Sequence, residues 1–307
     1  MTRLTALRVP PRLVPGDRVA VVATSGPLVA QRLHRGAAVL ASWGLEVAVG
    51  EHALATGRHH AGSDRQRADD LQRAWCDVST RAVIVGRGGS GAARIVDLLD
   101  WEAMAAAGPR WLVGFSDVTV LHQAVANRLG LATLWGPMAA TAIFAGERPD
   151  EPSRDLLRAA LFAPEELDLL ADGLTTIVPG RSTGVLVGGT LALLANTVGT
   201  PEHRPAAGGI ALLEDVGEPA FRLDSMLTQL LRVSWFDDVA GIALGSWTDC
   251  GEGALDTVVE RLAPLGVPMV TGLGFGHSAP QLTVPLGVRA ELDATAGRLS
   301  LSGEARR

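Results

Sequence analysis

Short apolar runs alternate with longer amphipathic stretches along the first half of the chain. The runs have the length and composition of buried strands and lie at residues 18–23, 46–49, 81–85, 111–113 and 131–134. The stretches between them, such as residues 30–43 and 64–74, are spaced like helices, and Ser63 to Gln66 forms a capping box before the second. Because strands that alternate with helices form parallel sheets, the sequence predicts an α/β, Rossmann-like N-terminal domain over residues 1–144.

The pattern changes after residue 144. Residues 145–179 are polar, charged and proline-bearing, and we expect them to form a linker. A second, smaller α/β domain is predicted over residues 180–307. It would contain a strand, a Gly-Gly turn and a helix from residue 184 onward, strands at 210–213, 240–244 and 269–271, and an antiparallel hairpin in the alternating tail.

A glycine-rich turn, Gly86 to Gly91, follows the third predicted strand and precedes a predicted amphipathic helix over residues 92–100. Its spacing is formally G-x-G-x-x-G, the phosphate-binding pattern of dinucleotide enzymes. That pattern normally follows the first strand, however, and no acidic residue ends a strand about 20 residues later. The turn could instead present backbone N–H groups to a developing anion, or simply be a tight turn that needs glycine.

The segment from Trp111 to His122, WLVGFSDVTVLH, predicts a short buried strand, a tight turn and the start of a helix. A serine at such a turn has its hydroxyl exposed at the edge of the sheet. The amide of Asp117 would lie at a helix N-terminus, where negative charge is favoured. Ser116 is therefore a candidate nucleophile with half of an oxyanion hole beside it. The alternative is that Ser116 or Asp117 only caps the helix.

Composition limits the chemistry open to the chain. All 27 basic residues of the Lys and Arg type are arginine, and the absence of lysine excludes Schiff-base and P-loop lysine chemistry. There is no tyrosine either, which excludes a tyrosine acid or base. The net charge of −6 argues against a nucleic-acid partner, and no apolar run approaches the ~20 residues of a membrane span. The N-terminus has no apolar signal core, and Cys76 and Cys250 lie far apart. We therefore expect a cytoplasmic protein without disulfides or a cysteine-rich metal site.

Two further candidates follow predicted strands in the second half of the chain, namely Glu214 and His277. A serine hydrolase needs a base to take the serine proton and a carboxylate to orient that base, and the order Ser, Glu, His is compatible with this. Taken alone, Glu214 could cap a helix or pair with Arg222, and His277 could be an ordinary loop histidine. The adjacent His59 and His60 are expected to be solvated loop residues.

Eight segments carry, in order, a resemblance to the LD-carboxypeptidase family of serine peptidases, which also includes microcin-immunity peptidases. They are PGDRVAVVATSGP, AGSDRQRADDLQRA, VIVGRGGSGAARIVDLLD, LVGFSDVTVLH, WGPM, GVLVGGTLALLANTVGTP, LLEDVGEPAFRLDSMLTQL and FGHSAPQLTVPLG. Together they extend over nearly the whole chain.

The resemblance implies a Ser–His–Glu triad divided between the domains, with the active site at their interface. Ser116 matches the nucleophile, His277 the base and Glu214 the acid, and the backbone N–H groups of Asp117 and Gly89 would form the oxyanion hole. The implied reaction removes the terminal D-alanine of muropeptide tetrapeptides, an L-to-D bond, in cytoplasmic wall recycling. It needs no metal or nucleotide cofactor, and the family commonly forms homodimers.

The chain departs from the family's usual pattern near the expected site. Ser90 stands where an aromatic residue is usual, and Trp135 stands where histidine is common. We expect both to line the substrate cleft. Arg87 is our candidate for binding the free carboxylate of the substrate, because guanidinium binds carboxylates in a bidentate manner. The alternative for Arg87 is an ion pair with Asp97 or Asp100.

Three other functions remain open at this point. A related serine peptidase could hydrolyse peptide–nucleotide or other amide antibiotics. The Gly86–Gly91 turn could bind NAD(P). The chain could also bind muropeptides without turning them over.

Overall fold

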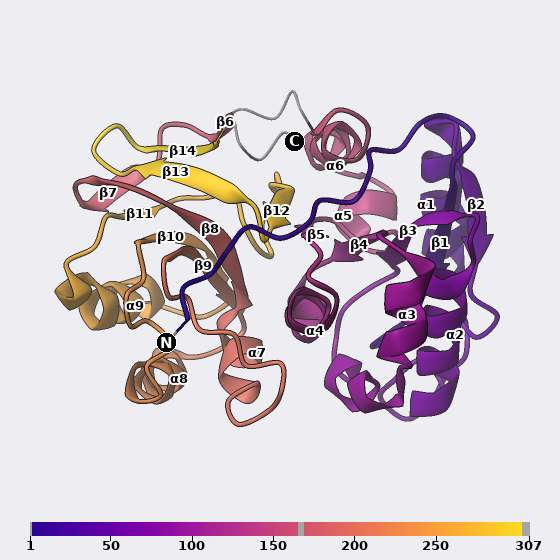
Figure 1. Cartoon of the computed structure of the whole chain (residues 1–307), viewed down its shortest axis with the longest axis horizontal. Coiled ribbons are helices and arrows are strands. Elements are labelled where there is room, and N and C mark those ends of the chain that lie inside the picture. The colour runs from indigo at the N-terminus through magenta and orange to yellow at the C-terminus, as the bar shows by residue number, and fades with distance from the viewer. Residues whose placement is uncertain (1, 165–168, 303–307) are drawn as a thin grey trace. The chain divides into compact units, whose positions relative to one another are not determined.

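The structure, a computed structural model, describes residues 2–164 and 169–302. The chain divides into two compact units, one of residues Arg8–Pro164 and one that joins Met1–Leu7 to Glu165–Arg307 (Figure 1). Residues 1, 165–168 and 303–307, which include part of the expected linker and the end of the expected second domain, lie outside the described residues. Within the described ranges, no helix has the length and apolar character needed to cross a membrane.

The first unit is built on the parallel sheet that the apolar runs predict. Its strands lie in the order β5-β4-β3-β1-β2. They are β1 (Arg18–Val22), β2 (Glu46–Val49), β3 (Thr80–Val85), β4 (Trp111–Gly114) and β5 (Thr133–Trp135). Strand order reverses between β1 and β3, and α/β sheets bind their ligands beyond the carboxyl ends of the strands at such a switch point.

Helices cover the sheet of this unit, and Figure 1 labels them. They are α1 (Ala30–Ser42), α2 (Asp64–Cys76), α3 (Trp101–Ala107), α4 (Thr119–Leu129), α5 (Ala142–Ala145) and α6 (Glu151–Phe162). Helix α1 packs against α5, and α2 packs against α3. The predicted capping box is confirmed, because the Ser63 hydroxyl accepts the Gln66 N–H and the Gln66 side chain accepts the Ser63 N–H.

The helix predicted over residues 92–100 is wrong. Two short 3₁₀ helices, η1 (Ala92–Arg94) and η2 (Val96–Leu98), occupy this stretch. Leu99 is extended, and the Asp100 carboxylate accepts the Ala103 N–H to begin α3. The cap at Asp100 starts a new helix, so the buried Ile95 and Val96 before it belong to short separate turns instead.

The second unit contains an eight-stranded mixed sheet in the order β6-β14-β13-β8-β9-β10-β11-β7. Strands β8 to β11 are parallel, and the predicted hairpin β13–β14 is confirmed as antiparallel. The strands of this sheet are β6 (Leu169–Ala171), β7 (Thr175–Val178), β8 (Arg181–Thr190), β9 (Gly209–Val216), β10 (Gly241–Thr248), β11 (Met269–Thr271), β13 (Arg289–Asp293) and β14 (Arg298–Leu301), and the short strand β12 (Val284–Leu286) is not part of it. The interval expected as a linker thus holds α6, β6 and β7.

Helices α7 (Leu191–Asn196), α8 (Ala220–Arg232) and α9 (Ala254–Leu262), with η5 (Ala263–Leu265), pack on this second sheet. Helices α8 and α9 lie side by side (Figure 1). Leu223, Leu227 and Leu230 of α8 are fully buried and share one hydrophobic core with the strands. Their spacing of three and four residues places them on one face of the helix.

The Gly-Gly turn predicted near residue 188 is wrong, because Gly188 and Gly189 lie inside β8. Gly188 has φ +145°, and a Cβ there would overlap the backbone of Leu212. The pair therefore lets β8 approach β9 closely. Strand β9 also runs beyond the predicted residue 213, so that Glu214 lies within it, opposite Thr190 of β8.

Candidate active site

Ser116 occupies a strained turn between β4 and the helix η3 (Ser116–Val118) in the first unit. Its φ is +62°, whereas the preceding Phe115 is extended. Ser116 is half-buried, and its neighbours on both sides are buried. Neither η3 nor α4 has a side-chain cap, so the capping alternative for Ser116 and Asp117 is not what the structure shows. A strained strand-to-helix turn of this kind holds a serine hydroxyl outward from a sheet.

The side chain of Asp117 fastens the glycine-rich turn to this serine turn. Asp117 is buried, and its Oδ2 accepts the backbone N–H of Ala92, directly after Gly91, at 2.8 Å. Gly88, in the same turn, lies against the nucleophile candidate: a Cβ at Gly88 would be 3.0 Å from Ser116 Cβ and 3.1 Å from its Oγ. Sequence reasoning gave Asp117 a backbone role in the oxyanion hole or a role as a helix cap, and it did not find this bond.

The Gly88–Gly89 peptide has a fixed orientation. The N–H of Gly26, in the turn after β1, donates to the carbonyl oxygen of Gly88 at 3.2 Å. Because a trans peptide directs its C=O and N–H to opposite sides, the Gly89 N–H faces away from Gly26. Gly89 has φ +124°, which favours glycine. Its service as an oxyanion donor stays a prediction.

His122 supports β4 from within the fold. Its Nε2 lies 3.0 Å from the carbonyl oxygen of Gly114, and its Nδ1 lies 2.8 Å from Thr133 Oγ1. Because a carbonyl can only accept, Nε2 carries the proton and Nδ1 accepts from the threonine hydroxyl. Burial lowers the pKa of His122 to about 4, so the ring is neutral near pH 7. It binds the last residue of β4, two positions before Ser116.

In the second unit, Glu214 and His277 form a hydrogen-bonded pair. His277 Nδ1 lies 2.7 Å from Glu214 Oε2, and the Glu214 side chain is fully buried. The carboxylate accepts a hydrogen bond from the Nδ1–H group, so the proton of the neutral ring stays on Nδ1 and Nε2 is the basic nitrogen. The arrangement can take a proton from a hydroxyl at Nε2 and stabilise the resulting imidazolium. The alternative of a Glu214–Arg222 pair is not found, because Arg222 pairs with Glu218 at 2.6 Å.

Three further residues position this pair. Thr190 Oγ1 donates to the second oxygen of Glu214 at 2.5 Å. Ser246 Oγ accepts the backbone N–H of His277 at 2.9 Å. A Cβ at Gly276 would lie 2.5 Å from Ser246 Oγ and 2.6 Å from Glu214 Oε2. Sequence reasoning missed these roles; the signals available were a hydroxyl directly after Gly-Gly and a glycine directly before the histidine.

Asp215 places a second carboxyl group beside Glu214. Its Oδ2 accepts the N–H of Ala192 in α7 at 2.8 Å, and its Oδ1 accepts the N–H of Val216 at 2.8 Å. Burial, with a smaller contribution from the charge of Glu214, raises the pKa of Asp215 to about 6. The charge next to Glu214 therefore changes close to neutral pH.

Arg87, predicted to bind a substrate carboxylate, is exposed on the glycine-rich turn. Within the described ranges, the two carboxylates named as its alternative partners engage other groups. Asp97 lies 4.0 Å from Arg128 Nη2, and Asp100 accepts the Ala103 N–H at 2.9 Å. Carboxylate binding by Arg87 stays a prediction.

Ser90 and Trp135, the other two predicted substrate residues, have different surroundings. Ser90 is exposed, and its Oγ lies 3.4 Å from Nε2 of His60. His60 is therefore half-buried against the turn rather than a fully solvated loop residue. Trp135 is buried, with its ring centre 6.0 Å from those of Phe115 and His122. Its indole supports the serine turn, and contact with a substrate stays a prediction.

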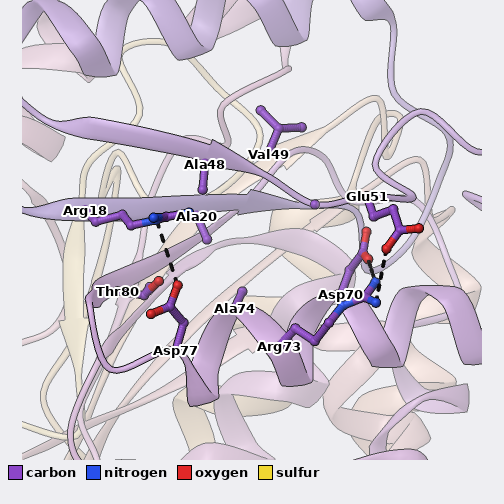
Figure 2. Close-up of a pocket in the computed structure, with 11 residues that line it drawn as sticks. Arg18, Ala20, Ala48, Val49, Glu51, Asp70, Arg73, Ala74, Asp77 and Thr80 are labelled. Atoms are coloured by element: carbon purple, nitrogen blue, oxygen red, sulfur yellow. Dashed lines mark hydrogen bonds and ion pairs between the residues drawn. The ribbon is translucent and has the colours of Figure 1, made fainter.

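A separate pocket of about 160 Å³ lies between α2 and strands β1 and β2 of the first unit (Figure 2). Its charged residues pair with one another: Arg73 contacts both Asp70 and Glu51, and Arg18 lies 3.9 Å from Asp77. Surface ion pairs of this kind contribute little energy, and they do not by themselves indicate a ligand. Across residues 2–164 and 169–302, no group of three or more His, Cys, Asp or Glu residues is placed to hold a metal ion.

Comparisons with known proteins find relatives that match most of the chain. Residues 19–136 match the LD-carboxypeptidase N-terminal domain, and residues 183–292 match the LD-carboxypeptidase C-terminal domain. A protein of Streptomyces coelicolor named as a carboxypeptidase is 53% identical over 95% of each chain. The murein tetrapeptide carboxypeptidase of Pseudomonas aeruginosa is 35% identical over 90% of this chain and 93% of its own.

A solved structure of MccF, the name of a microcin C7 self-immunity protein of Escherichia coli, has the same fold. Its TM-score is 0.87 at 20% identity, over 97% of this chain and 98% of that one. The Rossmann-like parallel sheet and the two-part α/β architecture predicted from the sequence are confirmed by this likeness and by the strand pairing. The two domain matches and the full-length relatives show that the chain belongs to the LD-carboxypeptidase family and is a hydrolase of the serine carboxypeptidase class.

Proposed function

We propose that this enzyme removes the terminal D-alanine from muropeptide tetrapeptides, with Ser116 as nucleophile, His277 as base and Glu214 as the group that orients His277. The observation that carries the proposal is the Glu214–His277 bond of 2.7 Å. It leaves Nε2 of the histidine as a base. The strained turn at Ser116, which presents a hydroxyl, is the second support.

In the proposed reaction, Ser116 Oγ attacks the scissile carbonyl carbon while its proton passes to His277 Nε2. The bond between the carbonyl carbon and the D-alanine nitrogen then breaks as His277 gives its proton to the leaving amine. The rest of the peptide remains as an ester on Ser116. Water, deprotonated by His277, hydrolyses that ester. The N–H groups of Asp117 and Gly89 would stabilise the oxyanion, and Arg87 would bind the carboxylate of the D-alanine. The proposal requires Ser116 Oγ to reach His277 Nε2.

The proposed role is recycling of wall peptides in the cytoplasm. The relative at 35% identity is named as a murein tetrapeptide carboxypeptidase, and the same chemistry on an intracellular peptide would return D-alanine and a tripeptide. A homodimer is the proposed assembly, and light scattering of the purified chain tests it.

The test is release of D-alanine from L-Ala-D-Glu-meso-diaminopimelate-D-Ala, followed by mass spectrometry. We expect release by the wild type and by Ser42→Ala, a change on the exposed part of α1, and none above background by Ser116→Ala. Release by Ser116→Ala at the wild-type rate would remove the nucleophile assignment. If the wild type releases no D-alanine, this tetrapeptide is not the substrate.

Hydrolysis of peptide–nucleotide antibiotics is the second candidate. The likeness to MccF concerns the fold, so it does not choose between the two substrates. A panel that pairs the tetrapeptide with an aminoacyl sulfamoyl nucleoside distinguishes them, because the preferred substrate has the larger kcat/KM.

A further inference from the structure

Arg67 is a buried arginine in α2, within the segment AGSDRQRADDLQRA that the reaction itself does not use. Its side chain is 0% exposed. A buried guanidinium is costly to desolvate, and hydrogen bonds at Nη1 and Nη2 offset that cost here, whereas Nε has no partner among the described residues. The positions of its partners therefore show what this residue does.

One nitrogen of Arg67 joins the two turns at the switch point of the sheet. Nη1 donates to the carbonyl oxygen of Thr24, after β1, at 2.8 Å and to that of Gly91, after β3, at 3.1 Å. Gly91 has φ +111°, and a side chain there would collide with Nη1 of Arg67. The turn and the arginine thus fit only when residue 91 is glycine.

The peptide group between Gly91 and Ala92 is held at both ends. Its carbonyl oxygen accepts from Arg67, and its N–H donates to Asp117 Oδ2 at 2.8 Å. Asp117 is the residue after Ser116. The end of the glycine-rich turn is therefore fixed between α2 on one side and the serine turn on the other.

Asp64 holds the guanidinium in this orientation. It accepts from Arg67 Nη2 and also from Arg94, whose Nη2 lies 2.7 Å from Asp64 Oδ2. Arg94 belongs to η1, directly after the turn. The Asp64 carboxylate, which is 30% exposed, thus binds both Arg67 in α2 and Arg94 in η1.

We infer that Arg67 is the positioning residue of the oxyanion turn: it holds the Gly86–Gly91 turn so that the Gly89 N–H faces the carbonyl oxygen under attack. The inference rests on the proposed function, in which that N–H is an oxyanion donor. Lysine cannot replace Arg67, because a single ammonium lacks the planar fork that reaches Thr24, Gly91 and Asp64 together.

A structural role and a positioning role have different kinetic effects. Loss of packing alone lowers stability and leaves the turnover of the folded enzyme unchanged. A displaced oxyanion donor lowers kcat and leaves KM nearly unchanged. It also lowers the affinity for a phosphonate analogue of the tetrahedral intermediate by the same factor as kcat/KM.

The experiment compares Arg67→Lys and Asp64→Asn with Arg73→Lys in the full chain. Arg73 lies on the same helix and pairs with Asp70 and Glu51 (Figure 2) rather than with a residue of the turn. We expect kcat for D-alanine release to fall roughly 10- to 100-fold in Arg67→Lys, with KM within about threefold and a parallel loss of phosphonate affinity. Asp64→Asn should show the same pattern with a smaller loss, and Arg73→Lys should match the wild type.

Wild-type kcat in folded Arg67→Lys, or equal losses in Arg73→Lys, would overturn the inference. If Arg67→Lys does not fold, Asp64→Asn decides, because its carboxylate is partly exposed and the change keeps its shape. Ser116→Ala is assayed in parallel. Activity in that variant removes the proposed function and this inference with it, whereas an inactive Ser116→Ala beside a fully active Arg67→Lys removes the inference alone.

Discussion

His277 Nδ1 lies 2.7 Å from Oε2 of Glu214, a carboxylate that is fully buried. Because Glu214 can only accept, it fixes the proton on Nδ1 and keeps Nε2 basic. Glu214→Gln offers an amide that can turn and donate to Nδ1, which selects the wrong tautomer. We expect kcat to fall roughly 10³- to 10⁴-fold with little change in KM.

The matched control for that prediction is Glu218→Gln. Glu218 pairs with the exposed Arg222 just after the same strand. Its loss should leave kcat within about twofold, since exposed ion pairs contribute little. A Glu214→Gln enzyme that keeps more than a tenth of wild-type kcat would show that His277 does not depend on Glu214 for its tautomer.

The strain at Ser116 predicts a gain in stability when its side chain is removed. A φ of +62° costs a serine or an alanine roughly 1 kcal/mol or more, and costs glycine almost nothing. Ser116→Gly should therefore have a larger free energy of unfolding than Ser116→Ala by about 1 kcal/mol, and both should be inactive. Urea unfolding of the two variants measures the difference.

Ser79 provides the comparison, because it is exposed and is not among the residues with positive φ. Ser79→Gly should be less stable than Ser79→Ala, which is the reverse of the order expected at Ser116. The same order at both positions would mean that the turn at Ser116 is not strained.

The contact between Gly88 and Ser116 predicts a coupled effect. A Cβ at Gly88 would lie 3.1 Å from Ser116 Oγ, and Gly88 is not among the glycines with positive φ. Gly88→Ala should therefore keep the fold but push the nucleophile aside, with kcat reduced at least about tenfold.

A double-mutant cycle tests the physical cause of that loss. In a Ser116→Gly background the new methyl group has no side chain to meet. The destabilisation by Gly88→Ala should then be smaller by about 1 kcal/mol than in the wild type. Additive effects on the free energy of unfolding would show that the two residues do not touch.

Much of the fold could be predicted from the sequence, because local pattern determines it. Strands β2 and β11 begin and end where the apolar runs do, and the capping box marks the start of α2. The errors occur where tertiary contacts override the pattern. Residues 92–100 look helical, but Asp100 caps a new helix there. Gly188 and Gly189 look like a turn, but they lie in a strand pressed against β9.

The candidate site could be predicted only in part. The side chains proposed to react have chemistry that is visible in the sequence, so the sequence predicts Ser116, Glu214 and His277, and their catalytic roles stay proposals. The groups that hold them are ordinary residues. The position of Thr190 after Gly-Gly does not show that its hydroxyl reaches Glu214, and the sequence around Ser246 does not show that its hydroxyl reaches the His277 backbone.

His122 makes stability depend on pH. Its folded pKa is about 4, whereas an unfolded histidine has a pKa of about 6.5. Above pH 6.5 the ring is neutral in both states and its contribution is fully present. As pH falls toward 4, only the unfolded chain takes up a proton. Titration of His122 should therefore lower the free energy of unfolding by about 2 kcal/mol between pH 7 and pH 5, and by about 3 kcal/mol by pH 4.

His122→Asn removes this titration, so its unfolding free energy should depend less on pH than that of the wild type. Urea unfolding at pH 7 and pH 5 should show the wild type losing about 2 kcal/mol more than the variant over this interval. His34→Asn, at an exposed position on α1, should lose as much as the wild type. If all three proteins lose the same amount, His122 is not held neutral by burial.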